Sequence, residues 1–420
     1  MTSETQTRLW MYLGHFLNHI GNYLTPALLI YLQTDIPLTQ TERGVLGSIP
    51  MILLVCLSSI VGTIGDRKHL WKKHLIWFGL IGIGVSGVLM TLATSFIDLT
   101  LATVILGFGL STYHPPAFYY LNSMPQRDKN MGIFAVAGNM GTAITPLIAM
   151  LLSIFSGWRF SFLAFAIIMI LAGLAFALLF PNDPEFNNDF DKYNEGEEKK
   201  SEVFSRSQMI ILVFLVVLIS ATRAPVFRCI SYFTSVVFVD GFHFSNIESS
   251  ILTAIVLGIG AFSALLGGLV NNRKAERGAK RDERVIFRTN TLLISNGGST
   301  LLLIFLVFLP FGITILLIYL LLAFVFFFGA AILPTIISEI ASSKQMGTSF
   351  GVLFTGATLA GAIAPTIFGM LADSEGGFPL SFAFLDIIAF TCLLLIILFR
   401  VQYLRVTKQI KANKRRQPVP

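Results

Sequence analysis

The stretch Gly62-Thr63-Ile64-Gly65-Asp66-Arg67 ends a long apolar run and begins a short charged one. A weaker copy, Gly268-Leu269-Val270-Asn271-Asn272-Arg273, lies 206 residues later (from 62 to 268), close to half of the 420-residue chain. A glycine allows two helices to approach closely, and an acid followed by a base suits the point where a helix leaves the lipid. A motif repeated at half the chain length predicts two related halves in a membrane protein.

The composition also indicates a polytopic membrane protein. Hydrophobic residues make up 54% of the chain and charged residues 13%, with a mean hydropathy of +0.75; soluble proteins carry about 25% charged residues. Cys56, Cys229 and Cys392 all lie in apolar runs, which argues against a disulfide framework or a cysteine-based metal site. The net charge of +7 is concentrated in loops on one side of the membrane, so we expect no nucleic-acid partner.

Apolar stretches of about 20 residues predict twelve membrane-spanning helices, six before and six after a polar segment. The predicted spans lie near residues 10–32, 44–64, 75–96, 99–121, 131–155, 160–180, 209–239, 251–270, 285–309, 313–337, 347–371 and 381–404. The predicted organisation is an N-terminal six-helix bundle (1–180), a cytoplasmic linker (181–207), a C-terminal six-helix bundle (208–404) and a basic cytoplasmic tail (405–420).

The placement of lysine and arginine predicts the orientation. With the N-terminus inside, 26 of the 30 basic residues fall on the cytoplasmic side and two, Arg43 and Arg159, fall on the outer side. The other two, Arg223 and Arg228, lie within a predicted span. Cytoplasmic loops of membrane proteins carry the excess of Lys and Arg. We therefore expect a multi-pass protein of the plasma membrane with both termini in the cytoplasm.

The chain resembles the major facilitator superfamily over nearly its whole length. The residues at 62, 66 and 67 match the motif that this family carries between its second and third helices, and Asn272 replaces the acid in the second copy. The resemblance implies two pseudo-symmetric six-helix bundles around a central cavity, alternating access, and function as a monomer. It also implies a gating motif formed by Gly62, Asp66, Arg67, Gly268, Asn272 and Arg273.

Within this family, three short motifs resemble fosmidomycin-resistance-type efflux proteins. They are His15-Phe16-Leu17-Asn18, His114-Pro115 and Gly138-Asn139-Met140-Gly141. Two positions differ: His19 stands where that branch usually has an aspartate, and Thr103 stands where many drug/proton antiporters have an arginine. The family's proton-coupling groups are therefore not carried over to these positions.

Two arginines lie inside the predicted seventh span. A charged side chain at the centre of a bilayer costs at least about 2.5–3.5 kcal/mol, so it must serve a purpose or find partners. Arg223 and Arg228 are five residues apart, or about 140° around an ideal helix, and do not share a face unless Pro225 bends it. We expect at least one of them to bind an anionic substrate group; the alternative is a structural contact with helix dipoles or backbone carbonyls.

Histidines form a second polar feature. His15 and His19 share one face of the first span with Asn18 and Asn22. They can exchange protons near neutral pH, form a metal pair completed by His114, or act as packing residues. We predict no metal, because no carboxylate or thiolate joins them at a useful spacing. We take His15, His19 and His114 as proton-coupling candidates.

No acidic residue lies deep in any predicted span, so the cavity is expected to be electropositive and to suit an organic anion. The predicted function is proton-coupled efflux of a small anionic or amphiphilic solute, without a cofactor. Uncoupled or symport-type uptake, and a non-transporting receptor or scaffold, are the alternatives. We find no nucleotide-binding loop, no His-rich metal motif and no paired carboxylates in the sequence, so we do not expect an enzyme. The predicted substrate-binding residues are Arg223, Arg228, His19, Asn22, Tyr113 and Asn139.

Overall fold

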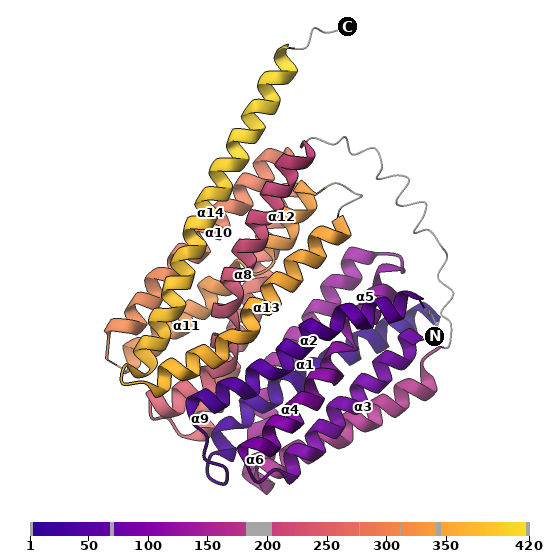
Figure 1. The fold of residues 1–420 in the computed structure, drawn as a ribbon, viewed down its shortest axis with the longest axis vertical. Helices are drawn as coiled ribbons and strands as arrows, with labels where there is room; N and C mark the ends of the chain where they lie inside the picture. The colour runs from indigo at the N-terminus through magenta and orange to yellow at the C-terminus, as the bar shows by residue number, and fades with distance from the viewer. Residues whose placement is uncertain are drawn as a thin grey trace. The chain divides into compact units, whose positions relative to one another are not determined.

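The computed structural model describes residues 3–67, 71–181, 204–276, 278–310, 312–341 and 346–416. Every regular element in these ranges is a helix (Figure 1). The elements are α1 (Ser3–Leu32), α2 (Gln40–Arg67), α3 (Trp71–Leu92), α4 (Phe96–Ser111), α5 (His114–Asn122), α6 (Arg127–Leu179), α8 (Arg206–Val236), the π-helix η1 (Val237–Gly241), α9 (Asn246–Glu276), α10 (Arg281–Phe308), α11 (Ile313–Phe328), α12 (Ile332–Ile340), α13 (Met346–Asp373) and α14 (Gly377–Arg416). The predicted all-α membrane fold is confirmed. Most of the predicted linker and the end of the basic tail lie outside the described residues.

Ten stretches of the described helices are long and apolar enough to cross a membrane. One of them, Lys129–Leu179, has 51 residues, or about 77 Å of helix, which is more than twice the hydrocarbon thickness. Gly157 divides it, with a left-handed φ of 81° that favours glycine, so it holds the predicted fifth and sixth spans. Helix α1 is not among the ten, because its polar residues lower its hydropathy. Counting α1 and the divided α6 gives the twelve spans that the sequence predicts.

The turn at Gly157 is held by the two residues that follow it. Trp158 donates its indole N–H to a carboxylate oxygen of Asp35 at 3.0 Å, and Arg159 pairs with the same carboxylate. These hydrogen bonds lower the pKa of Asp35 below its usual value, and the bond from Arg159 has the largest effect. The carboxylate therefore stays ionised at neutral pH, and its contribution to stability is lost only as the pH falls through this lowered pKa.

The described residues form two compact units. One contains the described residues up to 181 together with Arg228–Ala261 and Ala362–Ser381, and the other contains the remaining described residues. Helices α8, α9, α13 and α14 each contribute residues to both units. The predicted division at residues 181–207 follows the sequence repeat rather than these contacts, and it stays a prediction.

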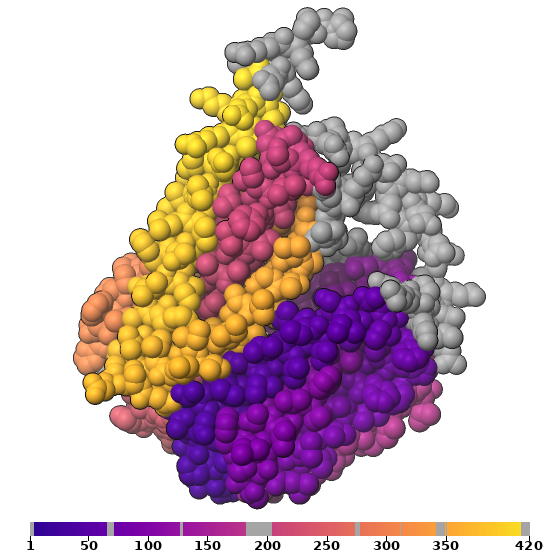
Figure 2. Space-filling model, in the orientation of Figure 1, coloured from indigo at the N-terminus to yellow at the C-terminus, as the bar shows by residue number. Residues whose placement is uncertain are grey.

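Close helix packing in the first unit depends on glycine. Helix α3 packs against α4 and α6, α1 packs against α6, and α2 packs against α4. Figure 1 shows these helices side by side, and in Figure 2 the atoms of α2, α3 and α4 form a continuous surface. Gly109 of α4 faces the backbone of α3 so closely that an added Cβ would lie 2.8 Å from the Ile83 nitrogen and 2.9 Å from the Gly79 oxygen. A side chain at this position would separate the two helices.

The start of α2 joins residues from both halves of the sequence within the same unit. The Asp373 carboxylate at the end of α13 accepts hydrogen bonds from the backbone N–H groups of Gln40 (2.8 Å) and Thr41 (2.7 Å). It therefore caps the positive end of the α2 dipole. Arg43 forms a 2.7 Å ion pair with Asp240 of η1. These contacts explain why η1 and the end of α13 belong to the first unit.

The predicted repeat appears as two broken helices of equal dimensions. The fourth predicted span consists of α4 (16 residues) and α5 (9 residues), and the tenth consists of α11 (16 residues) and α12 (9 residues). Gly62 of α2 lies beside the first break, where an added Cβ would be 3.9 Å from Pro115. Gly268 of α9 lies beside the second break, at the same distance from Ala331. Both motif glycines thus lie beside a break in a neighbouring helix.

Candidate functional site

Arg223 of α8 has one short hydrogen bond and one longer contact. Its Nη2 donates to the backbone oxygen of Phe326 at 2.7 Å, near the negative end of the α11 dipole. Its Nη1 lies 3.3 Å from Asn296 Oδ1, and Asn296 is itself fixed by a 2.7 Å bond to the Ala389 oxygen. The guanidinium also lies 4.5 Å from the centre of the Phe326 ring. These contacts match the structural alternative that the sequence left open.

Arg228 lies five residues later and has different surroundings. Its two terminal nitrogens make only long contacts with α1, at 3.4 Å to the Tyr23 hydroxyl and 3.3 Å to Asn22 Oδ1. Good N–H···O bonds are about 2.9–3.0 Å long. Its Nε is buried and has no hydrogen-bond partner among the described residues. Arg228 is therefore a buried cation with spare donors and no short hydrogen bond, whereas Arg223 has the 2.7 Å bond to the Phe326 carbonyl.

Neither arginine forms an ion pair with a carboxylate within the part of the chain that the structure describes. A guanidinium keeps its charge at any physiological pH and has five donor N–H groups. A carboxylate, sulfonate or phosphate group that accepts two of these bonds would complete the shell of Arg228. Asn22 and Tyr23 would then lie beside the bound anion.

The three candidate histidines lie together. His15 and His19 are neighbours on α1, with ring centres 4.5 Å apart, and His114 is the first residue of α5, with its ring centre 5.2 Å from that of His15. One ligand atom from each of the three lies within 4.8 Å of the others. We call His15, His19 and His114 the histidine cluster. It adjoins the Arg228 contacts along α1, since the ring centres of His19 and Tyr23 are 6.3 Å apart.

Helix α6 forms one wall of the histidine cluster. His15 Nδ1 lies 2.6 Å from the Phe134 oxygen, and the His15 ring stacks on the Phe134 ring at 3.6 Å. His19 Nδ1 lies 2.9 Å from Thr142 Oγ1. An added Cβ on Gly138 would be 2.6 Å from His15 Cε1 and 3.0 Å from His19 Nε2. Glycine at 138 therefore gives both rings their space.

The remaining predicted residues have other surroundings. Tyr113 is fully buried and donates its hydroxyl hydrogen bond to the Met11 oxygen, so this group is already engaged. Asn139 is exposed on α6, whereas its neighbour Gly138 faces the histidine cluster. Asn272 and Arg273 are exposed on α9. For residues 66 and 67 the structure describes the helical backbone but not the side chains. The gating motif stays a prediction.

Sequence reasoning missed three residues of interest. Phe134 and Thr142 lie four residues before and after Gly138, so a spacing of four along one face of α6 would have found them. Tyr23 follows Asn22 directly. Asp386 lies in the predicted twelfth span; α14 begins at Gly377, and one carboxylate oxygen of Asp386 is buried without a partner among the described residues.

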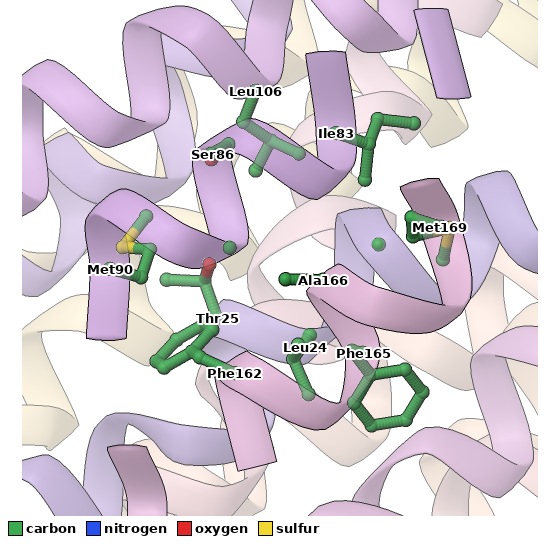
Figure 3. A pocket seen from close by; sticks show the side chains of 12 residues that line it. Leu24, Thr25, Ile83, Ser86, Met90, Leu106, Phe162, Phe165, Ala166 and Met169 are labelled. Carbon is green, nitrogen blue, oxygen red and sulfur yellow. The ribbon is translucent and has the colours of Figure 1, made fainter. Parts of the chain in front are cut away.

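A small cavity in the first unit lies apart from these polar groups (Figure 3). Its walls come from α1, α3, α4 and α6 and include Leu24, Ile83, Met90, Phe162 and Met169. Its volume of about 20 Å³ has room for roughly one water molecule. An organic substrate does not fit there, so we do not assign this cavity to binding.

Comparison with known proteins identifies the family. Residues 11–365 match the model of the Major Facilitator Superfamily. The chain belongs to this family. Membership makes it a membrane transporter of small molecules rather than an enzyme.

The chain is similar in sequence to three named proteins. The chain is 25% identical over 397 residues to the probable sulfoacetate transporter of Cupriavidus necator, with 89% of this chain and 88% of the relative covered. It is 23% identical over 389 residues to the hexuronate transporter of Bacillus subtilis, with 89% of each covered. The fosmidomycin resistance protein of Escherichia coli is 30% identical over 141 residues, or 33% of this chain and 34% of the relative. The superfamily is therefore established, but the predicted branch rests on a third of the chain.

Solved structures support the fold of this superfamily member. A bacterial homolog of the human lysosomal transporter Spinster superimposes with a TM-score of 0.71 at 18% identity, covering 96% of this chain and 97% of the other. A POT family transporter in complex with 5-aminolevulinic acid gives a TM-score of 0.73 at 14% identity, with 95% and 96% covered. At these identities the likeness concerns the fold alone.

The contrast between the two arginines of this transporter makes a prediction about stability. Replacing Arg223 by Gln removes the 2.7 Å bond to the Phe326 carbonyl and leaves Asn296 Oδ1 without the Arg223 donor, and we expect a loss of about 1–3 kcal/mol in unfolding free energy. Arg228→Gln removes only long contacts, and we expect a change within about 0.5 kcal/mol. Thermal unfolding of the two variants in one detergent, without substrate, measures the difference. Equal destabilisation by both substitutions would contradict the assignment.

Proposed function

We propose that this transporter carries a small organic anion and that Arg228 binds the anionic group. The observation that carries the proposal is the surroundings of Arg228, a buried guanidinium with a free Nε and two long contacts. Asn22 Oδ1 and the Tyr23 hydroxyl lie beside it and can bind further polar groups of the substrate. Arg228 recognises the charge, and its α1 neighbours add selectivity.

The relatives favour the same chemical class. The names of two relatives that align over most of this chain refer to sulfoacetate and hexuronate, both organic anions. A sulfonate or carboxylate accepts two parallel N–H bonds from a guanidinium, a geometry that the ammonium of lysine does not offer. We therefore propose a carboxylate or sulfonate of low molecular mass as the substrate, moved by alternating access.

Ligand-induced stabilisation tests the substrate class. We expect anions, but not neutral or cationic solutes of similar size, to raise the unfolding temperature of the detergent-purified protein near pH 6.5. A ligand at 100 times its dissociation constant adds about 2.7 kcal/mol to native-state stability. Arg228→Gln should abolish this shift and Arg228→Lys should weaken it, because only arginine forms the paired bonds.

Arg223→Gln is the matched control for that experiment, since it removes the same group from the same helix. Its own stability is expected to be lower, but the shift caused by the anion should remain. If cations or neutral lipophiles alone stabilise the protein, or if Arg223→Gln abolishes the shift and Arg228→Gln does not, the proposed site is wrong.

We further propose that transport is outward and coupled to protons through the histidine cluster, in a protein of the plasma membrane with both termini in the cytoplasm. Histidine is the side chain whose ordinary pKa allows it to exchange protons near neutral pH. The charged and titratable groups that face the cluster are its own three imidazoles, Tyr113, Tyr23 and, beyond Tyr23, Arg228. Asp386 is the competing candidate, because one of its oxygens is buried without a partner in the described structure.

Flux in proteoliposomes tests the coupling. We expect an imposed pH gradient to drive anion accumulation against its concentration gradient, and a protonophore to abolish it. His19→Gln should leave exchange of anion for anion intact but remove the response to the gradient, whereas Asp386→Asn should keep that response. The reverse pattern would assign coupling to Asp386, and gradient-independent flux in the unaltered protein would indicate a facilitator.

A further inference from the structure

The histidine cluster has the arrangement of a metal site. A divalent transition metal needs several nitrogen donors whose lone pairs converge, and imidazole is a preferred ligand for Zn²⁺, Cu²⁺ and Ni²⁺. Here one ligand atom from each of His15, His19 and His114 lies within 4.8 Å of the other two. His15 is buried and the other two are half-buried. Three imidazoles with an open fourth position are sufficient to hold zinc in proteins.

The hydrogen bonds of the His15 and His19 rings indicate which ring nitrogen has a lone pair available for a metal ion. His15 Nδ1 faces a backbone oxygen at 2.6 Å, which can only accept, so this nitrogen must carry the proton. Thr142 Oγ1 lies 3.2 Å from the Gly138 oxygen, to which it can donate, and 2.9 Å from His19 Nδ1, from which it can then accept. The neutral His15 ring therefore keeps a lone pair on Nε2, and the His19 ring does so when Thr142 donates to Gly138. Metal-binding histidines usually donate their other N–H in this way.

The third histidine contributes an unused nitrogen. His114 Nδ1 is buried and makes no hydrogen bond of good geometry among the described residues, although the Leu110 backbone lies close enough to interact with the His114 ring. Buried polar atoms normally have a partner, so one without a partner needs an explanation. His114 is also the first residue of α5, where Pro115 and Pro116 fix the backbone. A metal ion would be the missing partner of this nitrogen.

We propose that His15, His19 and His114 bind one divalent first-row transition metal ion, with Zn²⁺ as the representative case. Zinc–nitrogen bonds of 2.0–2.1 Å in a tetrahedral site place the nitrogens about 3.4 Å apart. The three donors would have to draw together by up to about 1.4 Å from their 4.8 Å limit, which side-chain rotation can supply. This differs from the sequence prediction of no metal, because three converging imidazoles need no carboxylate or thiolate.

The charges near the cluster limit its affinity. Arg228 is a cation that lies beyond the Tyr23 ring, and no carboxylate is among the described groups that contact the three rings. A positive charge disfavours a bound cation, so we expect weaker binding than in sites backed by acids. Removing the charge of Arg228 should therefore raise the affinity for the metal ion.

Calorimetric titration of Zn²⁺ into the full-length, tag-free protein in detergent tests the proposal. We expect one ion per chain. His114→Gln should lower the affinity at least 100-fold, and His74→Gln, which alters an exposed histidine of α3, should leave it unchanged. Thr142→Val removes the acceptor of His19 Nδ1 without touching a ligand, and loss of such an outer partner usually costs 10–100-fold in affinity. Arg228→Gln should raise the affinity.

Several results would overturn the site. These are no saturable binding near one ion per chain, the same affinity in His114→Gln as in the unaltered protein, or an equal loss in His74→Gln. Thr142→Val guards against misfolding of a cluster variant, since it keeps all three imidazoles. The proposal rests on the cluster geometry and not on anion transport; a bound ion would compete with the coupled proton for the same imidazole nitrogens. Anion-induced stabilisation, measured with a chelator present, is therefore a separate result that can stand or fall alone.

Discussion

A guanidinium inside a membrane-spanning helix stays charged, so it must find acceptors, an anion or a path to water. This requirement separates the two arginines of α8. Arg223 uses the carbonyl of Phe326 near the end of α11 together with Asn296, whereas Arg228 has two long contacts and a free Nε. Burial without full pairing is costly, and it persists in transporters where a substrate supplies the missing acceptors. The proposed anion site follows from that difference.

Much of the architecture could be predicted from the sequence, because it depends on hydropathy and on a repeat. The apolar runs gave the spans, and the glycines at 62 and 268 marked equivalent positions beside two broken helices. The breaks themselves were not predicted. Both spans read as continuous apolar helices, and local backbone geometry at residues 112–113 and 329–331 interrupts them. Likewise α1 carries so many polar residues that a hydropathy criterion alone omits it.

The site was only partly predictable, since it depends on which face of each helix meets its neighbour. The 140° separation correctly implied different surroundings for the arginines, but not which of the two would lack partners. Helix α6 is apolar on most sides, so its sequence could not show that Gly138, rather than Asn139, faces the histidines. That choice is made by close packing against α1, where a Cβ on Gly141 would also meet the backbone oxygen of Phe16.

The most direct test of the account is to locate a bound anion. A structure of the full-length protein with a bromine-labelled carboxylate, phased on the anomalous signal of bromine, would place the ligand without ambiguity. We expect the carboxylate within hydrogen-bond distance of the Arg228 guanidinium, beside Asn22 and Tyr23. A carboxylate bound at Arg223, or one that contacts neither arginine, would contradict the claim that Arg228 recognises the substrate.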